Sequence, residues 1–244
     1  MRQTRIYQPT ELTEHGYVTL TDNAANHVRR VLRLGPGDEL TLFNGGGRDF
    51  SGCIDSVERD RVVVSVGEAT TIERESPVRI SLLQGICRGQ RMDMLIQKST
   101  ELGVHRIQPI LTERVVVKIA AERIEKKMNH WQGIAVGACE QSGRAVVPEI
   151  LAPGTLEEAC LHADPETTKV FLDPDGQENL AALVESVGSI ALLIGPEGGL
   201  TRPERTLVSD HGFKSVSLGP RILRTETAPL AAISVIQYLA GDFR

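Results

Sequence analysis

From Val78 onward, short apolar runs alternate with amphipathic helical patterns, and no other feature of the sequence constrains the fold as strongly. Each run has the length and composition of a strand that is buried on both faces of a parallel sheet. The predicted strands are Val78 to Leu83, Arg106 to Ile110, Lys169 to Leu172, Ile190 to Ile194 and Lys214 to Leu218. The alternation predicts an α/β domain, in which ligands bind at the carboxyl ends of the strands.

The segments between these strands carry helix signals. One helix is expected to end at Gly103, and another is expected from the spacing of three and four residues between its apolar positions. Their inward residues are Met92, Leu95, Ile96, Ser99 and Leu102 in the first, and Ile124, Met128, Trp131, Ala135 and Ala138 in the second. A capping box with proline at the first helical positions, Thr201 to Glu204, begins a further helix, and Pro229 to Leu239 forms the last.

The N-terminal part, residues 1–72, is predicted to be a separate and mostly β domain, and residues 73–244 form the second domain. Short β-like runs are separated by turn signals, and Gly45-Gly46-Gly47 is expected to be a hairpin turn. One helix interrupts them from Asn23 to Leu34, with Asp22 as its cap. Its inward positions are Ala24, Val28, Val31 and Leu32, and its outward positions are Arg29, Arg30 and Arg33.

The composition excludes several classes of protein. The chain has 244 residues, of which 41% are hydrophobic, so it has enough apolar side chains for real cores. No run approaches the roughly 20 apolar residues of a membrane span, and the start has no apolar secretion signal, so a cytoplasmic protein is expected. Four scattered cysteines and six scattered histidines suggest neither disulfides nor a metal site. The net charge of -5 indicates that any contact with nucleic acid is local.

Two glycine-containing loops follow predicted strands near the C-terminus, where a ligand is expected. They are Gly195 to Gly199 and Gly219 to Thr227. Glycine lets the backbone approach a ligand closely, although each loop alone could be an ordinary turn between a strand and a helix.

Five motifs in a fixed order span nearly the whole chain. They are His27 to Arg33, Gln97 to Val104, Glu140 to Arg144, Ile194 to Gly199 and Ser217 to Ala228. In this order they resemble the SPOUT superfamily of knotted methyltransferases, and within it the enzymes that methylate uridine N3 in bacterial 16S ribosomal RNA. One departure from the family pattern is Asn26, where histidine is expected beside His27.

The resemblance implies a PUA-like β-barrel that contacts RNA, followed by a SPOUT α/β domain with a C-terminal trefoil knot, in a homodimer. It also implies S-adenosylmethionine as the cofactor. The implied cofactor residues are Leu172, Asp173, Ile194, Gly195, Pro196, Glu197, Gly198, Gly199, Leu218, Gly219, Ile222, Leu223 and Arg224. Periodicity alone does not indicate a knot, since knots are rare. The G-x-G-x-x-G fingerprint of a dinucleotide fold is missing from this domain.

Methyl transfer to uridine N3 requires removal of the N3 proton and stabilisation of the resulting anion. Arg144 and Arg224 are the candidates for stabilising the anion. Glu140, Glu197 and Glu226 are the candidates for accepting the proton, and Glu140 is assigned to the catalytic group with the two arginines. For each of these residues a structural ion pair or helix cap is the alternative.

The substrate partner is expected to be 16S ribosomal RNA or the small ribosomal subunit. Its phosphates are expected to contact Arg29, Arg30, Arg33, Lys98 and Arg114, with Lys118 extending this track. Aromatic residues make up only 4% of the chain, which disfavours a base-stacking platform. Three alternatives stay open: a knotted methyltransferase acting on transfer RNA or on a ribose 2'-hydroxyl, a non-catalytic ribosome-assembly factor, and a dehydrogenase. The apolar last helix gives some support for a dimer, although burial within one chain is possible.

Overall fold

The computed structural model describes residues 4–59, 61–115, 121–164, 166–185 and 187–243, which form two compact units. The N-terminal unit comprises Met1–Glu75 and Val136–Val147. The C-terminal unit comprises Ser76–Ala135 and Pro148–Arg244. The N-terminal unit therefore includes a stretch from the middle of the chain besides the residues that the sequence assigns to it.

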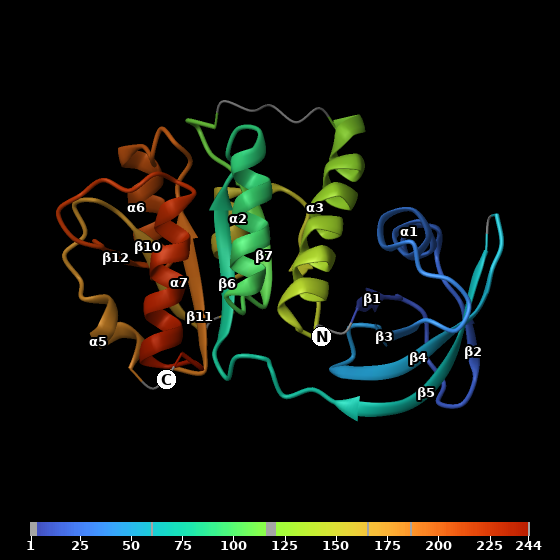
Figure 1. The fold of residues 1–244 in the computed structure, drawn as a ribbon. Helices are drawn as coiled ribbons and strands as arrows, with labels where there is room; N and C mark the ends of the chain where they lie inside the picture. The colour runs from blue at the N-terminus through green and yellow to red at the C-terminus, as the bar shows by residue number, and fades with distance from the viewer. Residues whose placement is uncertain (1–3, 60, 116–120, 165, 186, 244) are drawn as a thin grey trace. The chain divides into compact units, whose positions relative to one another are not determined.

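The N-terminal unit is built on a five-stranded mixed sheet with the order β1-β3-β4-β5-β2 (Figure 1). β1 is parallel to β3, and the other neighbours are antiparallel. The strands are β1 (Arg5–Tyr7), β2 (Tyr17–Thr19), β3 (Glu39–Phe43), β4 (Arg48–Val57) and β5 (Val62–Thr71). Between β3 and β4, Gly45 and Gly47 have φ angles of 89° and 79°, which only glycine adopts readily, so the expected hairpin turn is confirmed.

The expected helix of this unit differs in detail. It begins as α1 (Asp22–Asn26) and continues as the π-helix η1 (His27–Leu32). Its N-cap is Thr21 rather than the expected Asp22, and no side chain caps it. Val31 is 70% exposed instead of buried, because a π-helix bonds residue i to i+5 and rotates later positions off a face counted at 3.6 residues per turn.

The C-terminal unit contains a parallel sheet with the order β12-β10-β11-β6-β7-β8, and β9 also pairs with β7. The strands are β6 (Arg79–Gly85), β7 (Arg106–Leu111), β8 (Glu149–Ile150), β9 (Gly154–Thr155), β10 (Thr168–Leu172), β11 (Ser189–Ile194) and β12 (Lys214–Val216). All five predicted strands are confirmed, although the last ends at Val216 rather than Leu218. The central strands β6 and β11 are buried on both faces, as their near-continuous apolar sequences require.

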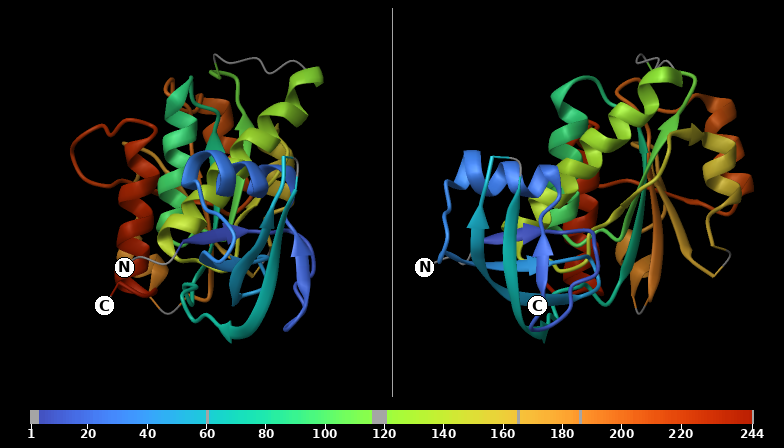
Figure 2. Two further views of the ribbon diagram at one scale, coloured as in Figure 1. Left: turned by 45° about the vertical axis from the view of Figure 1, so that its right-hand side comes forward. Right: turned by 90° about the vertical axis from the view of Figure 1, so that its right-hand side faces the viewer.

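Helices cover both faces of this sheet. Figure 2 shows α2 and α7 on one face and α4 and α6 on the other, and α2 packs against α7 as α4 packs against α6. The helices of the chain beyond η1 are α2 (Gln90–Glu101), α3 (Ala121–Ser142), α4 (Leu156–Leu161), α5 (Leu180–Val184), α6 (Arg202–Asp210) and α7 (Thr227–Leu239). Gly103 follows α2 with a φ angle of 86°, as the predicted helix end requires.

The capping box of α6 is also confirmed. The Thr201 hydroxyl accepts a hydrogen bond from the Glu204 amide, and the Glu204 carboxylate accepts one from the Thr201 amide at 2.7 Å. In the described part of the chain, no helix has both the length and the apolar character needed to cross a membrane.

A cavity at the carboxyl ends of three parallel strands

Strands β10, β11 and β12 bring three loops together in the C-terminal unit. The strands end at Leu172, Ile194 and Val216, and β10 lies between the other two in the sheet. The loops that follow them surround a cavity of about 570 Å³. The predicted cofactor residues that line it are Leu172, Asp173, Ile194, Gly195, Pro196, Glu197, Gly198, Gly199, Leu218, Gly219, Ile222, Leu223 and Arg224. The structure therefore brings every residue of that prediction to one cavity.

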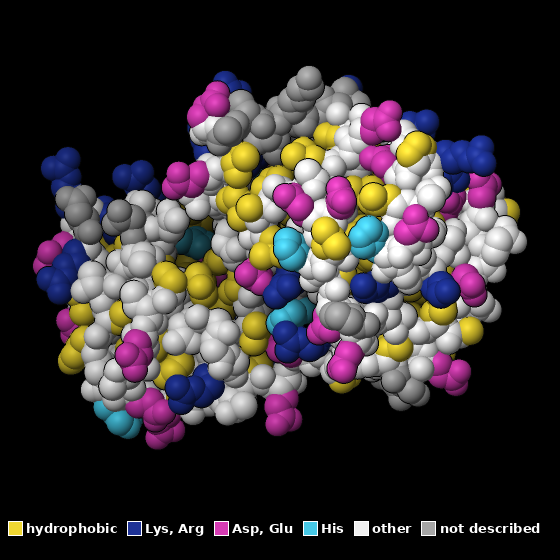
Figure 3. All heavy atoms as spheres, turned by 180° about the vertical axis from the view of Figure 1, so that it is seen from behind, with side chains coloured by type: hydrophobic (Ala, Val, Ile, Leu, Met, Phe, Trp, Pro, Cys, Tyr) yellow, Lys and Arg dark blue, Asp and Glu magenta, His cyan; other side chains and the backbone are white. Residues whose placement is uncertain are grey.

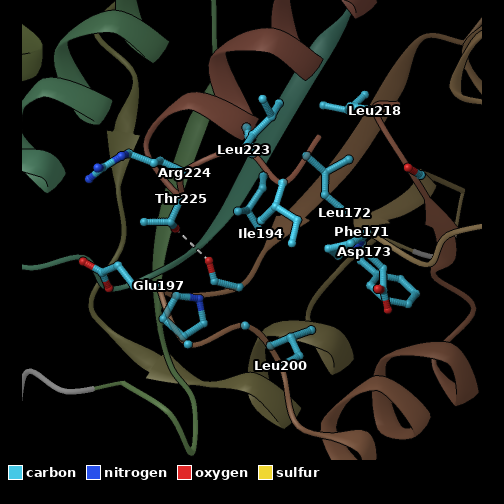
Figure 4. Close-up of a pocket in the computed structure, with 18 of the residues that line it drawn as sticks. Phe171, Leu172, Asp173, Ile194, Glu197, Leu200, Leu218, Leu223, Arg224 and Thr225 are labelled. Atoms are coloured by element: carbon cyan, nitrogen blue, oxygen red, sulfur yellow. Dashed lines mark hydrogen bonds between the residues drawn. The ribbon is translucent and has the colours of Figure 1, made fainter. Parts of the chain in front are cut away.

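Apolar side chains and backbone form much of the cavity wall. Figure 4 shows Leu172, Ile194, Leu218 and Leu223 around it, with Asp173 at one end and Glu197 at the other. Gly219 has a φ angle of 100°, which explains the need for glycine in that loop. A wall of this kind suits a flat, mostly apolar ring whose polar edge is bound by backbone groups.

Buried hydrogen bonds fix two of the loops to each other. The Thr225 hydroxyl donates to the carbonyl oxygen of Gly195 at 2.8 Å, and the Gln84 side-chain amide donates to the Thr225 hydroxyl at 3.2 Å. Thr225 is only 7% exposed, so these bonds are protected from water. Gln84 belongs to none of the predicted site residues. The signal in the sequence was a polar residue at the end of an apolar strand.

Gly85 is a second residue that the sequence analysis missed. A Cβ atom at this position would lie 2.7 Å from the carbonyl carbon of Gly195 and closer still to the backbone nitrogen of Pro196. The loop after β11 therefore packs directly on the backbone of β6, and only glycine leaves room for it.

Asp173 and Arg205 form the polar end of the cavity next to β10. Asp173 is 8% exposed, and its carboxylate accepts hydrogen bonds from the Asp175 amide and from Nη1 of Arg205 at 3.0 and 3.1 Å. The Asp173 carboxylate is thus held in place by groups on two elements, and it suits a ligand that carries hydroxyl groups.

Glu197, Arg91 and Glu226 form the other polar end. Oε1 of Glu197 accepts hydrogen bonds from the Arg88 amide at 3.1 Å and from Nη1 of Arg91 at 3.2 Å. Burial acts to raise the pKa of Glu197, but hydrogen bonds from the amides of Arg88 and Glu197 and from the Arg91 side chain outweigh it and lower the pKa. Glu197 is therefore a weak base, and its Oε1 atom is already engaged by two donors.

Arg224 lies at the rim of the cavity. Its carbonyl oxygen accepts hydrogen bonds from the amides of Thr227 and Ala228, which fixes its backbone at the start of α7. Its side chain is exposed, and Figure 4 shows it directed away from Leu172 and Ile194. The guanidinium group is thus placed to meet a second ligand rather than to line the apolar wall.

The other two predicted catalytic residues, Arg144 and Glu140, lie in the N-terminal unit. Arg144 is 4% exposed, and its guanidinium binds both carboxylate oxygens of Glu75, the closest contact being 2.6 Å from Nη2. Oε1 of Glu140 accepts a hydrogen bond from the Tyr7 amide at 3.0 Å, and Oε2 lies 3.5 Å from Nδ1 of His27. Both side chains therefore have structural partners within this unit.

Burial dominates the electrostatics of Glu140. Loss of water raises the pKa of Glu140, although the Tyr7 amide, His27 and Arg5 oppose this shift. Burial also raises the pKa values of the Cys87 and Cys139 thiols, to about 11 and about 12, so neither is a ready nucleophile at neutral pH.

The predicted RNA-binding residues lie in both units. Arg30 and Arg33 are exposed at the end of η1, whereas Nη1 of Arg29 donates a hydrogen bond to the carbonyl oxygen of Arg59. Lys98 forms an ion pair with Glu101 at 2.8 Å, and Arg114 donates to the carbonyl oxygen of Gly198 at 2.9 Å. Lys118 lies outside the described residues. On the face drawn in Figure 3, the coloured basic and acidic side chains are interspersed.

Comparison with known families gives two matches. Residues 74–237 match the model of the RNA methyltransferase domain, and residues 20–67 match the model of the RNA methyltransferase PUA domain. The ribosomal RNA small subunit methyltransferase E of Buchnera aphidicola (strain Sg) is 33% identical over 238 residues, which cover 98% of this chain and 97% of that protein. The protein of the same name from Bacillus subtilis is 33% identical over 249 residues, with 95% of both chains covered.

Two similar solved structures contain the same small molecule. A methyltransferase of Legionella pneumophila in complex with S-adenosylmethionine is 44% identical with a TM-score of 0.96. The ribosomal RNA small subunit methyltransferase E of Neisseria gonorrhoeae, bound to S-adenosylmethionine, is 40% identical with a TM-score of 0.93. Both alignments cover 100% of each chain.

Proposed function

We propose the function of this chain from the premise that it belongs to the ribosomal RNA small subunit methyltransferase E family of RNA methyltransferases. The chain is an enzyme that uses S-adenosylmethionine to methylate 16S ribosomal RNA of the small subunit, and the acceptor atom is uridine N3. The supporting observation is the cavity at the ends of β10, β11 and β12, because all the predicted cofactor residues line it. The small-subunit relatives favour this function over transfer RNA methylation, a purely structural assembly factor and a dehydrogenase.

The cavity fits the cofactor in size and chemistry. Its volume of about 570 Å³ lies within the roughly 300 to 1,000 Å³ that small-molecule sites enclose. Leu172, Ile194, Leu218 and Leu223 would contact the adenine ring, and the glycine loops would present backbone groups to its edge. Asp173 would accept hydrogen bonds from the ribose hydroxyls.

Bound S-adenosylmethionine supplies an electrophilic methyl group on a positively charged sulfur. The chain must hold the uracil ring against this methyl group, exclude water, and stabilise the negative charge that develops on the ring oxygens when N3 loses its proton. Arg224 fits the last task, because its backbone is fixed at the cavity rim while its guanidinium is exposed. Arg144 and Glu140 were also expected in the catalytic group. Their partners Glu75 and Tyr7 favour positioning roles for them in the N-terminal unit.

The remaining features of the proposal concern architecture and partners. We propose that the N-terminal unit is a PUA-like barrel whose Arg30 and Arg33 contact phosphates, and that the chain after β12 is threaded as a trefoil knot. A cytoplasmic location follows from the ribosomal substrate.

We also propose a homodimer formed through α7. Val235 and Tyr238 on α7 are 40% and 66% exposed, and Met94 on the neighbouring α2 is 41% exposed. An apolar surface of this kind is typical of an interface. Sedimentation velocity should give twice the chain mass, and Tyr238→Glu should shift the protein towards the monomer.

Two experiments test the proposed function. Nucleoside analysis of 16S ribosomal RNA from cells that lack this protein should show the loss of one 3-methyluridine, and a different lost nucleoside would refute the proposed acceptor. In a tritiated-methyl assay, Arg224→Ala should retain calorimetric binding of S-adenosylmethionine and lose methyl transfer. Unchanged turnover would remove Arg224 from the mechanism.

A further inference from the structure

The proposed reaction requires a proton acceptor beside the cofactor cavity. Uridine N3 is protonated at neutral pH, so its lone pair becomes available only when a base removes the proton. A carboxylate can serve only if one of its oxygens is not already engaged by other groups of the protein. This requirement distinguishes the three glutamates that the sequence offers.

Two of the three carboxylates fit this role less well. Glu140 belongs to the N-terminal unit, where the Tyr7 amide and His27 bind its two oxygens. Glu197 lines the cavity, but the hydrogen bonds that its Oε1 accepts from Arg88 and Arg91 help to lower its pKa and make it a weaker base.

Glu226 differs from both. It lines the cavity immediately after Thr225, its side chain is 12% exposed, and its Oε2 atom is buried without a hydrogen-bond partner among the described residues. Oε1 lies 3.6 Å from Nε of Arg91, a distance too long for a hydrogen bond. Buried polar atoms in folded proteins nearly always have partners. The Oε2 atom of Glu226 is therefore an unsatisfied acceptor on a residue that lines the ligand cavity.

We propose that Glu226 is the catalytic residue that accepts the N3 proton of the target uridine. The N3–H bond breaks and its proton passes to a carboxylate oxygen of Glu226. The electron pair left on N3 forms the bond to the methyl carbon, and the sulfur retains the electron pair of the broken carbon–sulfur bond. The products are neutral methyluridine and neutral thioether, and the proton leaves Glu226 for solvent. This step depends on the proposed function.

Arg91 has a positioning role in the same arrangement. One guanidinium group lies 3.2 Å from Glu197 and 3.6 Å from Glu226, so it links the two carboxylates across the end of the cavity. The positive charge of Arg91 thus lies close to both carboxylates. Among the described residues, the Cys87 thiol, after β6, lies near enough to both Glu226 and Glu197 for their charges to act on it.

The test compares Glu226→Gln with wild type, and Glu185→Gln serves as the control because Glu185 is exposed and lies outside the cavity. Calorimetry with S-adenosylmethionine should give a dissociation constant within about threefold of wild type for both variants, that is within about 0.7 kcal/mol. With saturating cofactor and small-subunit particles, kcat of Glu226→Gln should fall roughly 10²- to 10⁴-fold, the usual size of a general-base effect. Glu185→Gln should match wild type in both measurements.

The pH dependence gives a second readout. The kcat of wild type should fall at acid pH as Glu226 becomes protonated, and Glu226→Gln should lack this fall. Glu226→Asp should restore part of the rate together with the acid limb, and it replaces the glutamine variant in the test if that variant does not fold. A pH profile of Glu226→Asp that lacks the acid limb would overturn the proposal.

Other results separate the possible failures. An unchanged kcat in Glu226→Gln would overturn the proposal. A dissociation constant raised more than tenfold with kcat preserved at saturation would also overturn it, because Glu226 would then bind the amino group of the cofactor. If wild type itself binds no S-adenosylmethionine, the proposed function fails independently of Glu226.

Discussion

A single methyl group added at Gly85 should displace a loop that forms the cofactor cavity. The Cβ atom of Gly85→Ala would lie 2.7 Å from the Gly195 carbonyl carbon and 2.8 Å from Cδ of Pro196, whereas real Cβ atoms essentially never approach closer than 3.0 Å. The obstacle is backbone and a proline ring, which cannot rotate away, so the loop after β11 must retreat by several tenths of an ångström. Overpacking of this kind costs about 1–3 kcal/mol.

Because Gly195 is also held by Thr225, this retreat should disturb two of the three cavity loops. We expect the dissociation constant for S-adenosylmethionine to rise at least about tenfold, which corresponds to about 1.4 kcal/mol. We expect Tm to fall by about 2–4 °C for each kcal/mol lost. Isothermal titration calorimetry and thermal unfolding measure the two effects.

The matched control is Gly133→Ala, at an exposed position on α3 where an added Cβ meets nothing within 4 Å. It should leave cofactor affinity unchanged and stabilise the helix by up to about 1 kcal/mol. A Gly85→Ala protein that binds the cofactor within twofold of wild type would refute the steric argument.

Three further predictions concern the stability of single contacts. Arg144→Met should lower the free energy of unfolding, measured by urea denaturation, by about 1–3 kcal/mol. Loss of one partner of a fully buried pair costs about 3–5 kcal/mol, but the Glu75 side chain is 30% exposed, so the expected loss is smaller. An unchanged midpoint would show that the pair contributes nothing. Burial raises the pKa of Glu140, so the folded state binds its proton more tightly, and the wild-type stability that this provides is lost as pH rises above about 4.5. The stability of Glu140→Gln relative to wild type should therefore increase from pH 4 to pH 7, and the opposite trend would contradict the shift. Thr201→Ala should cost about 0.5–2 kcal/mol by removing one half of the α6 capping box, and thermal unfolding with no loss would argue against it.

The fold of the C-terminal unit was predictable because its signals are local. Apolar runs, the glycine after α2 and the capping box of α6 each act within a few residues, and all three are confirmed. The order of the strands was not predictable from periodicity, since β12 follows β11 in the sequence but lies beside β10.

The prediction of the inward positions of the helix at Asp22–Leu32 was partly wrong for a physical reason, although the signal for a helix was clear. Its apolar positions were counted at 3.6 residues per turn, and this count places Val28 correctly. Within the π-helix that begins at His27 the count fails for Val31, which is exposed, although Leu32 still packs partly buried against the core. No residue in this segment marks that change in winding, because π-helices arise from packing that a single sequence does not display.

The loops that form the cavity were predictable from the sequence, but the close packing at Gly85 was not. Gly199 and Gly219 have φ angles of 66° and 100°, a local conformational reason for glycine, so glycines in these loops could be expected. Gly85 has no such local signal, because its requirement comes from Pro196, which lies far away in the sequence.

Two of the arginine–glutamate pairs among the described residues illustrate the limit most clearly. In the sequence, Arg144 and Glu226 each lie in a motif that joins an arginine to a carboxylate, and either motif could serve catalysis. The structure pairs Arg144 with Glu75, 69 positions away, in contacts to both carboxylate oxygens that leave little capacity for a ligand. It pairs Glu226 only loosely with Arg91 and leaves Oε2 without a partner among the described residues. Because a group that binds a substrate must have a donor or acceptor to spare, the incomplete pair fits the chemistry better than the complete one. The residue that accepts the proton thus depends on which carboxylate the fold leaves unsatisfied. Tertiary contacts decide which carboxylate this is.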